Sequence, residues 1–256
     1  MIVDAPRRVV QFSCGAASAV AAKITLAKYP AAVVVNAFVA EEDADNRRFL
    51  ADVERWLGVQ IVVLSDTKYG ASAYEAIRRA RYTKGAFGAP CARAVKRDVL
   101  NAWSLPSDIP VIGYTAEEED RADGWIRRVG KAEFPLIEAG LTKANCLAMV
   151  ERAGIVLPRM YRMGYNNANC IGCVKGGEGY WNKIRTDFPE RFEEMARIEE
   201  SIGPSAYLFR DRATGKRISL RQLDPAKGRH SAISPECGFA CSHIEDEIDS
   251  TKGGAG

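Results

Sequence analysis

The stretch Val9-Val-Gln-Phe-Ser-Cys-Gly-Ala-Ala-Ser18 decides the fold of this chain. A short apolar strand runs into a turn of small residues, and an alanine-rich helix over Ala19–Lys28 follows. Such a turn leaves its backbone N–H groups uncovered, and the N-terminus of the next helix adds partial positive charge. Ser13 and Ser18 can add hydroxyl donors. The pattern therefore predicts a site for an anion such as phosphate, with an ordinary connection between strand and helix as the alternative.

The composition indicates a globular protein with one substantial core. The chain has 256 residues, of which 47% are hydrophobic and 27% charged. A net charge of +3 does not by itself indicate nucleic-acid binding. The segment Met1–Arg8 is not followed by the apolar region of a signal peptide, and the apolar stretch Ala31–Ala40 is too short to cross a bilayer. We therefore expect a cytoplasmic protein without a membrane partner, whose seven cysteines are reduced.

Apolar runs and helical periodicity alternate through the first 154 residues. The expected strands are Arg8–Phe12, Ala32–Phe38, Gln60–Leu64 and Pro110–Tyr114. The expected helices between and after them are Asp45–Leu57, Ser72–Arg81, Cys91–Trp103, Ala116–Val129 and Thr142–Ala153. This alternation predicts an α/β domain built on a doubly wound parallel sheet.

The composition changes after Gly154. Cysteine, glycine, tyrosine and tryptophan become frequent, a helix is expected at Pro189–Ser201, and a hairpin is expected where Ala206–Asp211 and Lys216–Leu220 flank a Thr-Gly turn. We therefore divide the chain into an α/β nucleotide-binding domain over 1–154, a small Cys-rich C-terminal metal-binding segment over 155–245, and a flexible polar tail over 246–256.

The cysteines form two close pairs, Cys170-Ile-Gly-Cys173 and Cys237-Gly-Phe-Ala-Cys241. Two such pairs supply the four thiolates of one metal centre, and the spacing suits both Zn²⁺ and a [4Fe-4S] cluster. Redox-active thiols and unrelated free cysteines remain alternatives. Because the C-terminal segment is poor in core-forming residues, we expect a metal to supply much of its stability. Cys91 and Cys146 could replace one of the four ligands or pack as small hydrophobic residues.

The loop Ser13–Ser18 resembles the Ser-Gly-Gly-x-x-Ser loop of the PP-loop ATP pyrophosphatases. This adenine nucleotide alpha hydrolase-like superfamily includes PAPS reductases, ATP sulfurylase small subunits and thiolation enzymes of tRNA and DNA. Cys14 stands where the first glycine is usual, and Ala17 where many members have aspartate. A helix N-terminus would lower the pKa of the Cys14 thiol, so a reactive role is an alternative to simple replacement of glycine.

Three further segments resemble the PAPS reductase-like branch. Pro90–Arg97 is similar to a Cys-Thr-x-x-x-Lys element, which would make Lys96 face phosphate. Gly113–Arg121 is similar to a Gly-x-x-x-x-Glu-x-x-x-Arg element, which would place Arg121 near the nucleotide. Asn169–Gly177 looks like the Cys-x-x-Cys part of the same branch.

The resemblance implies an enzyme that binds ATP, or a related adenine nucleotide, with Mg²⁺. The residues that would bind the nucleotide are Ser13, Cys14, Gly15, Ala16, Ala17, Ser18, Arg97 and Glu117. Lys96 and Arg121 would offset charge on the phosphates during catalysis. Asp45, with Asp43 or Glu42, follows the second strand and could position Mg²⁺, although an acidic cluster at a helix N-terminus needs no such role.

The expected reaction is ATP-dependent sulfur transfer in which an acceptor is adenylated and pyrophosphate leaves. Sulfonucleotide reductases have a Glu-Cys-Gly-x-His motif, but Phe239 and Ala240 follow Glu236-Cys237-Gly238 here. A PAPS or APS reductase with Cys237 or Cys241 as nucleophile is therefore an alternative, as is a non-catalytic nucleotide-binding protein with a structural metal. The acceptor, a nucleic acid or a small molecule, and the oligomeric state, a homodimer included, stay open.

Overall fold

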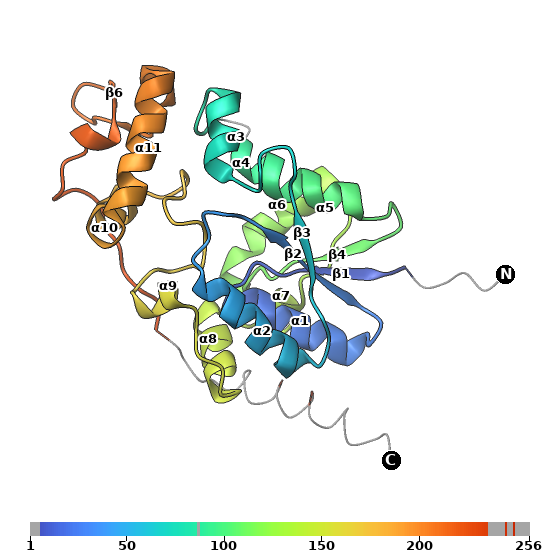
Figure 1. Cartoon of the computed structure of the whole chain (residues 1–256). Coiled ribbons are helices and arrows are strands. Elements are labelled where there is room, and N and C mark those ends of the chain that lie inside the picture. The colour runs from blue at the N-terminus through green and yellow to red at the C-terminus, as the bar shows by residue number, and fades with distance from the viewer. Residues whose placement is uncertain (1–5, 86–87, 235–243, 245–247, 249–256) are drawn as a thin grey trace, which may run out of the picture.

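The chain folds around a parallel β-sheet. The structure, a computed structural model, describes residues 6–85, 88–234, 244 and 248. Its four parallel strands have the order β3-β2-β1-β4. They are β1 (Arg8–Gln11), β2 (Val33–Phe38), β3 (Val62–Ser65) and β4 (Ile109–Val111). Helices flank this sheet, so the predicted α/β fold with a parallel sheet is confirmed (Figure 1).

The central strands are buried on both faces, as parallel strands usually are. Val10 is level with Val34 of β2 and with Val111 of β4, and all three side chains are buried. Strands β1, β2 and β3 follow one another in one direction across the sheet, whereas β4 lies on the opposite side of β1. The chain order therefore reverses between β1 and β4, the place where open α/β sheets bind ligands.

Four helices pack together on one side of the sheet, below it in Figure 1. They are α1 (Ala16–Lys28), α2 (Asp45–Leu57), α7 (Pro135–Glu138) and α8 (Lys143–Arg152). The helical elements above the sheet include α3 (Ala73–Ala80), α4 (Pro90–Ala92), α5 (Asp98–Trp103) and α6 (Glu119–Val129). None of the helices in the described part of the chain has the length and apolar character needed to cross a lipid bilayer.

Local patterns account for several helix ends. Helix α2 has the predicted bounds, because Phe49, Leu50 and Val53 form a buried stripe and Gly58 ends the helix in the left-handed conformation, with φ of +73°. Helix α8 begins after Thr142, whose side chain accepts a hydrogen bond from the backbone N–H of Asn145. The helix expected from Thr142 therefore begins one residue later, with Thr142 as its N-cap.

The helix expected over Cys91–Trp103 is not uniform. A π-helical turn, η1 (Arg93–Arg97), joins α4 to α5. Single π-helical turns are frequent at functional sites because they change the direction of the side chains that they carry. Lys96 and Arg97 lie in this turn.

The C-terminal helices pack around a core that is rich in aromatic side chains. Helices α10 (Glu178–Asp187) and α11 (Pro189–Ile202) bury Trp181, Phe192 and Met195 in one cluster with Tyr74 and Ile77 of α3. The expectation that this segment is poor in core-forming residues is therefore wrong. Apolar packing against α3 therefore contributes to its stability.

Short elements complete the described chain. They are η2 (Ala116–Glu118), α9 (Arg159–Arg162), η3 (Pro204–Ala206), the hairpin β5 (Phe209–Arg210) with β6 (Arg217–Ile218), and η4 (Leu220–Gln222). The hairpin strands are shorter than predicted. Ile248 is buried, and the other residues of the predicted tail lie outside the described part of the chain.

Candidate functional site

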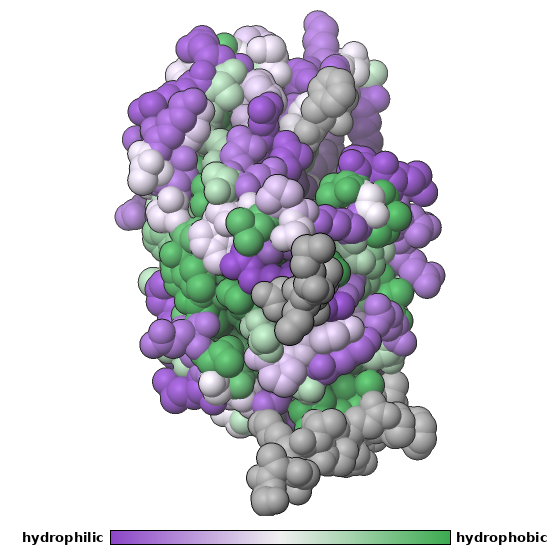
Figure 2. Space-filling view, turned by 90° about the vertical axis from the view of Figure 1, so that its right-hand side faces the viewer, coloured by the Kyte–Doolittle hydropathy of each residue, from purple (hydrophilic) through white to green (hydrophobic). Residues whose placement is uncertain are grey.

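A cleft of about 1090 Å³ opens where the order of the strands reverses. It is lined by residues that follow β1, by residues that follow β4, and by the turn that joins α4 to α5. The predicted nucleotide-binding residues Ser13, Gly15, Ala17 and Ser18 are among them. The side of the molecule that carries α5 and α6 is mostly hydrophilic, with apolar side chains gathered in patches (Figure 2).

The loop from Ser13 to Ser18 is closed by its own hydrogen bonds. The buried hydroxyl of Ser18 accepts a hydrogen bond from the Ser13 N–H at 3.1 Å and donates one to the Gly15 carbonyl at 2.9 Å. The hydroxyls of Ser13 and Ser18 are 3.2 Å apart. Ser18 therefore braces the loop, and Ser13 is the more exposed of the two hydroxyls.

The N-terminus of α1 is suited to an anion. Gly15 is its N-cap, no side chain of the described residues caps it, and its first turn has no acidic residue. The first N–H groups of an α-helix have no partner within the helix. Together with the helix dipole they attract negative charge, so this 13-residue helix presents to the cleft an end that is suited to an anion.

Gly113 allows the chain after β4 to approach this loop closely. A Cβ atom placed on Gly113 would lie 2.9 Å from Cα of Ser18 and 3.0 Å from its backbone nitrogen. Both neighbours are backbone atoms, so no side chain can move aside. The approach of β4 to α1 thus requires glycine, a role that the sequence pattern after the fourth strand did not reveal.

Cys14 is a structural residue of the loop. It has a left-handed backbone with φ of +57°, the conformation that glycine adopts most easily, and its side chain is fully buried. Its Sγ accepts a hydrogen bond from Nδ2 of Asn36 at 3.5 Å. Burial raises the pKa of the Cys14 thiol to about 12. The expectation that the helix N-terminus would lower this pKa is wrong, and the thiol is neutral at neutral pH.

Two basic residues of the π-helical turn line the cleft. Nζ of Lys96 is 2.8 Å from Oε1 of Glu42, a carboxylate that is 2% exposed. Burial is the largest single influence and lowers the pKa of the Lys96 ammonium, but the attraction and hydrogen bond of Glu42, with smaller effects of Cys170 and Cys14, together raise it. Arg97 also lines the cleft and has no ion pair with any residue that the structure describes. Both residues thus line the same cleft as Ser13 and Ser18.

Arg121 and Glu117 line the far side of the cleft. Arg121 pairs with Glu118, and its guanidinium carbon lies 4.3 Å from the ring centre of Tyr114. A carboxylate oxygen of Glu117 accepts a hydrogen bond from the Lys143 N–H at 3.0 Å, at the start of α8. Glu117 thus fixes one wall of the cleft to α8, while Arg121 offers a cation at its rim.

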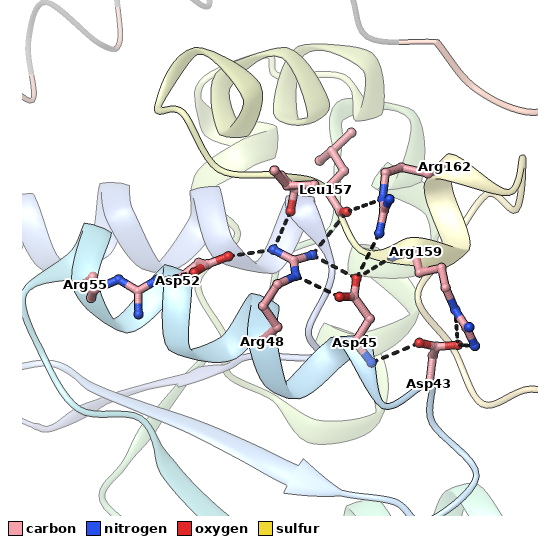
Figure 3. Close-up of polar contacts among 9 residues, drawn as sticks. Asp43, Asp45, Arg48, Asp52, Arg55, Leu157, Arg159 and Arg162 are labelled. Atoms are coloured by element: carbon pink, nitrogen blue, oxygen red, sulfur yellow. Dashed lines mark hydrogen bonds and ion pairs between the residues drawn. The ribbon is translucent and has the colours of Figure 1, made fainter.

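Asp43 and Asp45 are part of an ion-pair network on α2 and α9 (Figure 3). Both oxygens of Asp45 pair with Arg48, at 2.7 and 2.8 Å, and the hydrogen bond from Arg48 lowers the pKa of Asp45 to about 2. Asp43 accepts hydrogen bonds from Arg159 at 2.5 and 3.0 Å. Neither aspartate is among the described residues that line the cleft. The structure therefore places Asp45 away from the predicted catalytic position.

The cleft also has a wall that the sequence did not predict. Nζ of Lys143 donates a hydrogen bond to Asn167 at 2.8 Å, and the hydroxyl of Tyr161 would be 3.0 Å from a Cβ atom on Gly15. Asn166 and Asn169 line the same wall. Oδ1 of Asn166 is buried and has no hydrogen-bond partner among the described residues, which leaves it able to accept a hydrogen bond. The three asparagines just before Cys170 were the available indication of this wall.

Three cysteines from two distant segments interact electrostatically. Burial is the main cause that raises the pKa of Cys170, and Cys173 and Cys91 add to it. Burial also raises the pKa of Cys91 to about 11, with a further contribution from Cys173. Within the described residues, no three cysteine, histidine or acidic side chains are arranged as a metal site. Cys237 and Cys241 lie outside the described residues. Cys146 is buried in the core beside α1.

Comparison with protein-family models gave no match, and comparison with curated proteins gave none either.

Proposed function

We propose that this chain is an ATP pyrophosphatase similar to the PAPS reductase-like branch of the PP-loop superfamily. It binds ATP or a related adenine nucleotide in the cleft and adenylates an acceptor for sulfur transfer. One observation carries the proposal: the uncapped N-terminus of α1, packed against the chain after β4 at Gly113, opens into a cleft that is lined by Lys96, Arg97 and Arg121.

The phosphates of the nucleotide would bind at the loop. The N–H groups that open α1 would hold the β- and γ-phosphates, which leave as pyrophosphate. Lys96 and Arg97 face the same cleft and would offset the negative charge that builds up on the leaving group. Lys96 is kept charged by Glu42, and Arg97 is not neutralised by a described acidic residue, so both cations are available.

The volume of the cleft leaves room for a second substrate. Small-molecule sites commonly have volumes of about 300–1000 Å³, and this cleft reaches about 1090 Å³. Val35, Ala37 and Ile112 line it together with polar residues, so an apolar surface is available to a nucleobase. We expect Oδ1 of Asn166, which has no partner among the described residues, to accept a hydrogen bond from an N–H or O–H group of a bound substrate.

The chemistry would be attack of an acceptor oxygen on the α-phosphorus, with pyrophosphate as the leaving group. The adenylated acceptor would then lose AMP when a sulfur nucleophile attacks it. A Mg²⁺ ion would bridge the phosphates and keep several of its waters. Asp43 and Asp45 form hydrogen bonds with arginines, so the nucleotide and water, not these aspartates, would supply most of the ligands of this ion. The acceptor is a nucleic acid or a small molecule.

The cysteines suit a thiolate-held metal, either a [4Fe-4S] cluster or Zn²⁺. Cys170 and Cys173 would supply two ligands, and Cys91, whose pKa responds to Cys173, is the third described thiol near them. Cys237 and Cys241 are the further thiolates that the sequence offers. A [4Fe-4S] cluster held by only three of these thiolates would have one iron without a protein ligand and would supply a site for sulfide. Ile171 donates its N–H to the Glu41 carbonyl at 2.8 Å, which ties the cysteine turn to the region just after β2.

The test is release of pyrophosphate and AMP from ATP, with a thermal-shift assay for binding. We expect ATP with Mg²⁺ to raise the melting temperature, because a ligand that binds only the native state stabilises it. Ser18→Ala should lose most of this shift, since it removes the brace of the loop. Ser201→Ala, which removes a serine hydroxyl from the exposed end of α11, is the control. No shift and no pyrophosphate from the wild-type protein would refute the proposal.

Metal content is measured on the same preparation, purified without oxygen. Iron and sulfide with a brown colour would support the cluster, whereas bound zinc in a colourless protein would support a structural metal. Cys91→Ala should lower the metal content, and Cys146→Ala, in the core beside α1, should not.

A further inference from the structure

Two tyrosines hold the turn formed by residues 170–173, which we call the cysteine knuckle. Tyr180 of α10 places its hydroxyl inside this turn. The hydroxyl accepts hydrogen bonds from the N–H groups of Gly172 and Cys173 and donates one to the carbonyl of Cys170, each at 3.0 Å. One side-chain oxygen thus satisfies three backbone groups of the knuckle.

Tyr74 holds the knuckle from a different helix. It lies on α3, is 2% exposed, and donates a hydrogen bond from its hydroxyl to the Ile171 carbonyl at 3.0 Å. Gly172, with φ of +77°, leaves the space for this hydroxyl, because a Cβ atom there would collide with it. A Cβ atom on Gly176 would collide with the ring of Tyr180. The glycines around the knuckle are therefore matched to the two tyrosines.

The hydrogen bonds of the knuckle leave its sulfurs available. The N–H groups of Gly172 and Cys173 donate to Tyr180, and neither Cys170 nor Cys173 has a hydrogen bond to its sulfur from a described residue. A turn whose backbone is already satisfied by side chains does not depend on a metal to close it. The knuckle is accordingly part of the apolar core shared by α3, α10 and α11.

We propose that Tyr74 and Tyr180 are positioning residues, which hold Cys170 and Cys173 in the geometry for a thiolate-bound metal before the metal binds. This inference rests on the metal site of the proposed function. It adds that the site is preformed, and that the phenolic hydroxyls, not only the rings, maintain it. Partners that orient metal ligands commonly change metal affinity by about 10- to 100-fold when they are removed.

Tyr165 offers a matched control in the same aromatic cluster. Its ring packs edge to face on the ring of Tyr180 with centres 5.8 Å apart, but its hydroxyl donates to Asp187 at 2.8 Å and does not reach the knuckle. Tyr165→Phe and Tyr180→Phe each remove one hydroxyl from this cluster. Only Tyr180→Phe removes the three hydrogen bonds of the knuckle.

The first measurement is hydrogen exchange of the Gly172 and Cys173 amides in the full chain, reduced and freed of metal with a chelator. We expect these amides to exchange at least about tenfold faster in Tyr180→Phe than in the wild type, because they lose their acceptor. Tyr165→Phe should leave their exchange unchanged. Equal protection in Tyr180→Phe and the wild type would overturn the proposal.

The second measurement is titration with Co²⁺, whose absorption reports thiolate binding. We expect Tyr180→Phe to bind Co²⁺ at least about tenfold more weakly than the wild type and Tyr165→Phe to match the wild type. Tyr74→Phe, which removes a single hydrogen bond, should give a smaller loss and serves if Tyr180→Phe does not fold. Equal affinity in the wild type and the knuckle variants would overturn the positioning role alone. A wild-type protein that binds no Co²⁺ would overturn the metal site itself.

Discussion

Replacement of Gly113 by alanine tests the close approach on which the proposed nucleotide site depends. The added methyl carbon would lie 2.9 Å from Cα of Ser18. Carbon atoms in favourable contact are about 3.5–4.0 Å apart, so the chain after β4 and the start of α1 must separate by about 0.6–1.1 Å. The displaced atoms belong to the backbone of the loop Ser13–Ser18, so no flexible side chain can move aside in their place.

Two consequences are expected from this separation. Overpacking of this kind costs about 1–3 kcal/mol, and each kcal/mol shifts the melting temperature of a chain of this size by about 2–4 °C. A misplacement of about 1 Å in a catalytic site can cost about 100-fold in rate. We therefore expect Gly113→Ala to melt about 2–12 °C lower and to release pyrophosphate about 100-fold more slowly.

The assay compares thermal melting, with and without ATP, and pyrophosphate release for the wild type, Gly113→Ala and Gly85→Ala. Gly85 is the control because its φ is not left-handed and a Cβ atom there would have no neighbour within 4 Å. Wild-type melting and ATP binding in Gly113→Ala would refute the close approach. Lower melting with unchanged ATP binding would show that the nucleotide does not bind between β4 and α1.

Three further predictions concern charged residues. Asp45→Asn should lower the melting temperature at pH 7 and leave ATP affinity unchanged. Because the pKa of Asp45 is held near 2, chiefly by Arg48, its contribution to stability is lost only as the pH falls towards that value, so the melting temperatures of variant and wild type should converge in acid. A changed ATP affinity would count against this structural role. Lys96→Met should destabilise the protein by at most about 3–5 kcal/mol, because buried Glu42 loses its close cationic partner and keeps only Arg47, at 3.8 Å. Adding Glu42→Gln should restore stability measured by urea unfolding but not pyrophosphate release, and recovered activity would refute catalysis by Lys96. Burial raises the pKa of Glu199 from 4.5 to about 7, so stability should fall as the pH rises through this range and then level off. Glu199→Gln should make this fall smaller. If the melting temperatures of variant and wild type drop equally between about pH 5 and pH 7.5, this assignment is contradicted.

The parts of the fold that sequence predicted well are those with local causes. Helix α2 was predicted over its full length because its apolar residues recur at helical spacing and Gly58 stands just after it. The loop from Ser13 to Ser18 was recognised because small residues between a strand and a helix are a local pattern. Strand bounds were less accurate, since β4 is only three residues long.

The parts that sequence did not predict depend on distant contacts. Asp43 pairs with Arg159, which is 116 residues away, and no local pattern distinguishes such an ion pair from a metal-binding acid. The core of the C-terminal helices includes α3, so residues 155–234 were mistaken for a segment short of apolar partners. The role of Gly113 requires knowledge of where α1 begins in space.

The cleft and the cysteine knuckle share one structural support, the chain that follows β2. Glu41 accepts the Ile171 N–H at 2.8 Å, and Asn46 donates to the carbonyl of Ala168 at 3.1 Å. These two bonds fix both ends of the short segment 168–171, whose first residues line the cleft and whose end forms the knuckle. Between them Glu42 holds Lys96, whose pKa also responds to Cys170. A shift of the knuckle would therefore be expected to move Ala168 and Asn169 in one wall of the cleft, so a metal bound at the cysteines would be coupled to a nucleotide bound in the cleft.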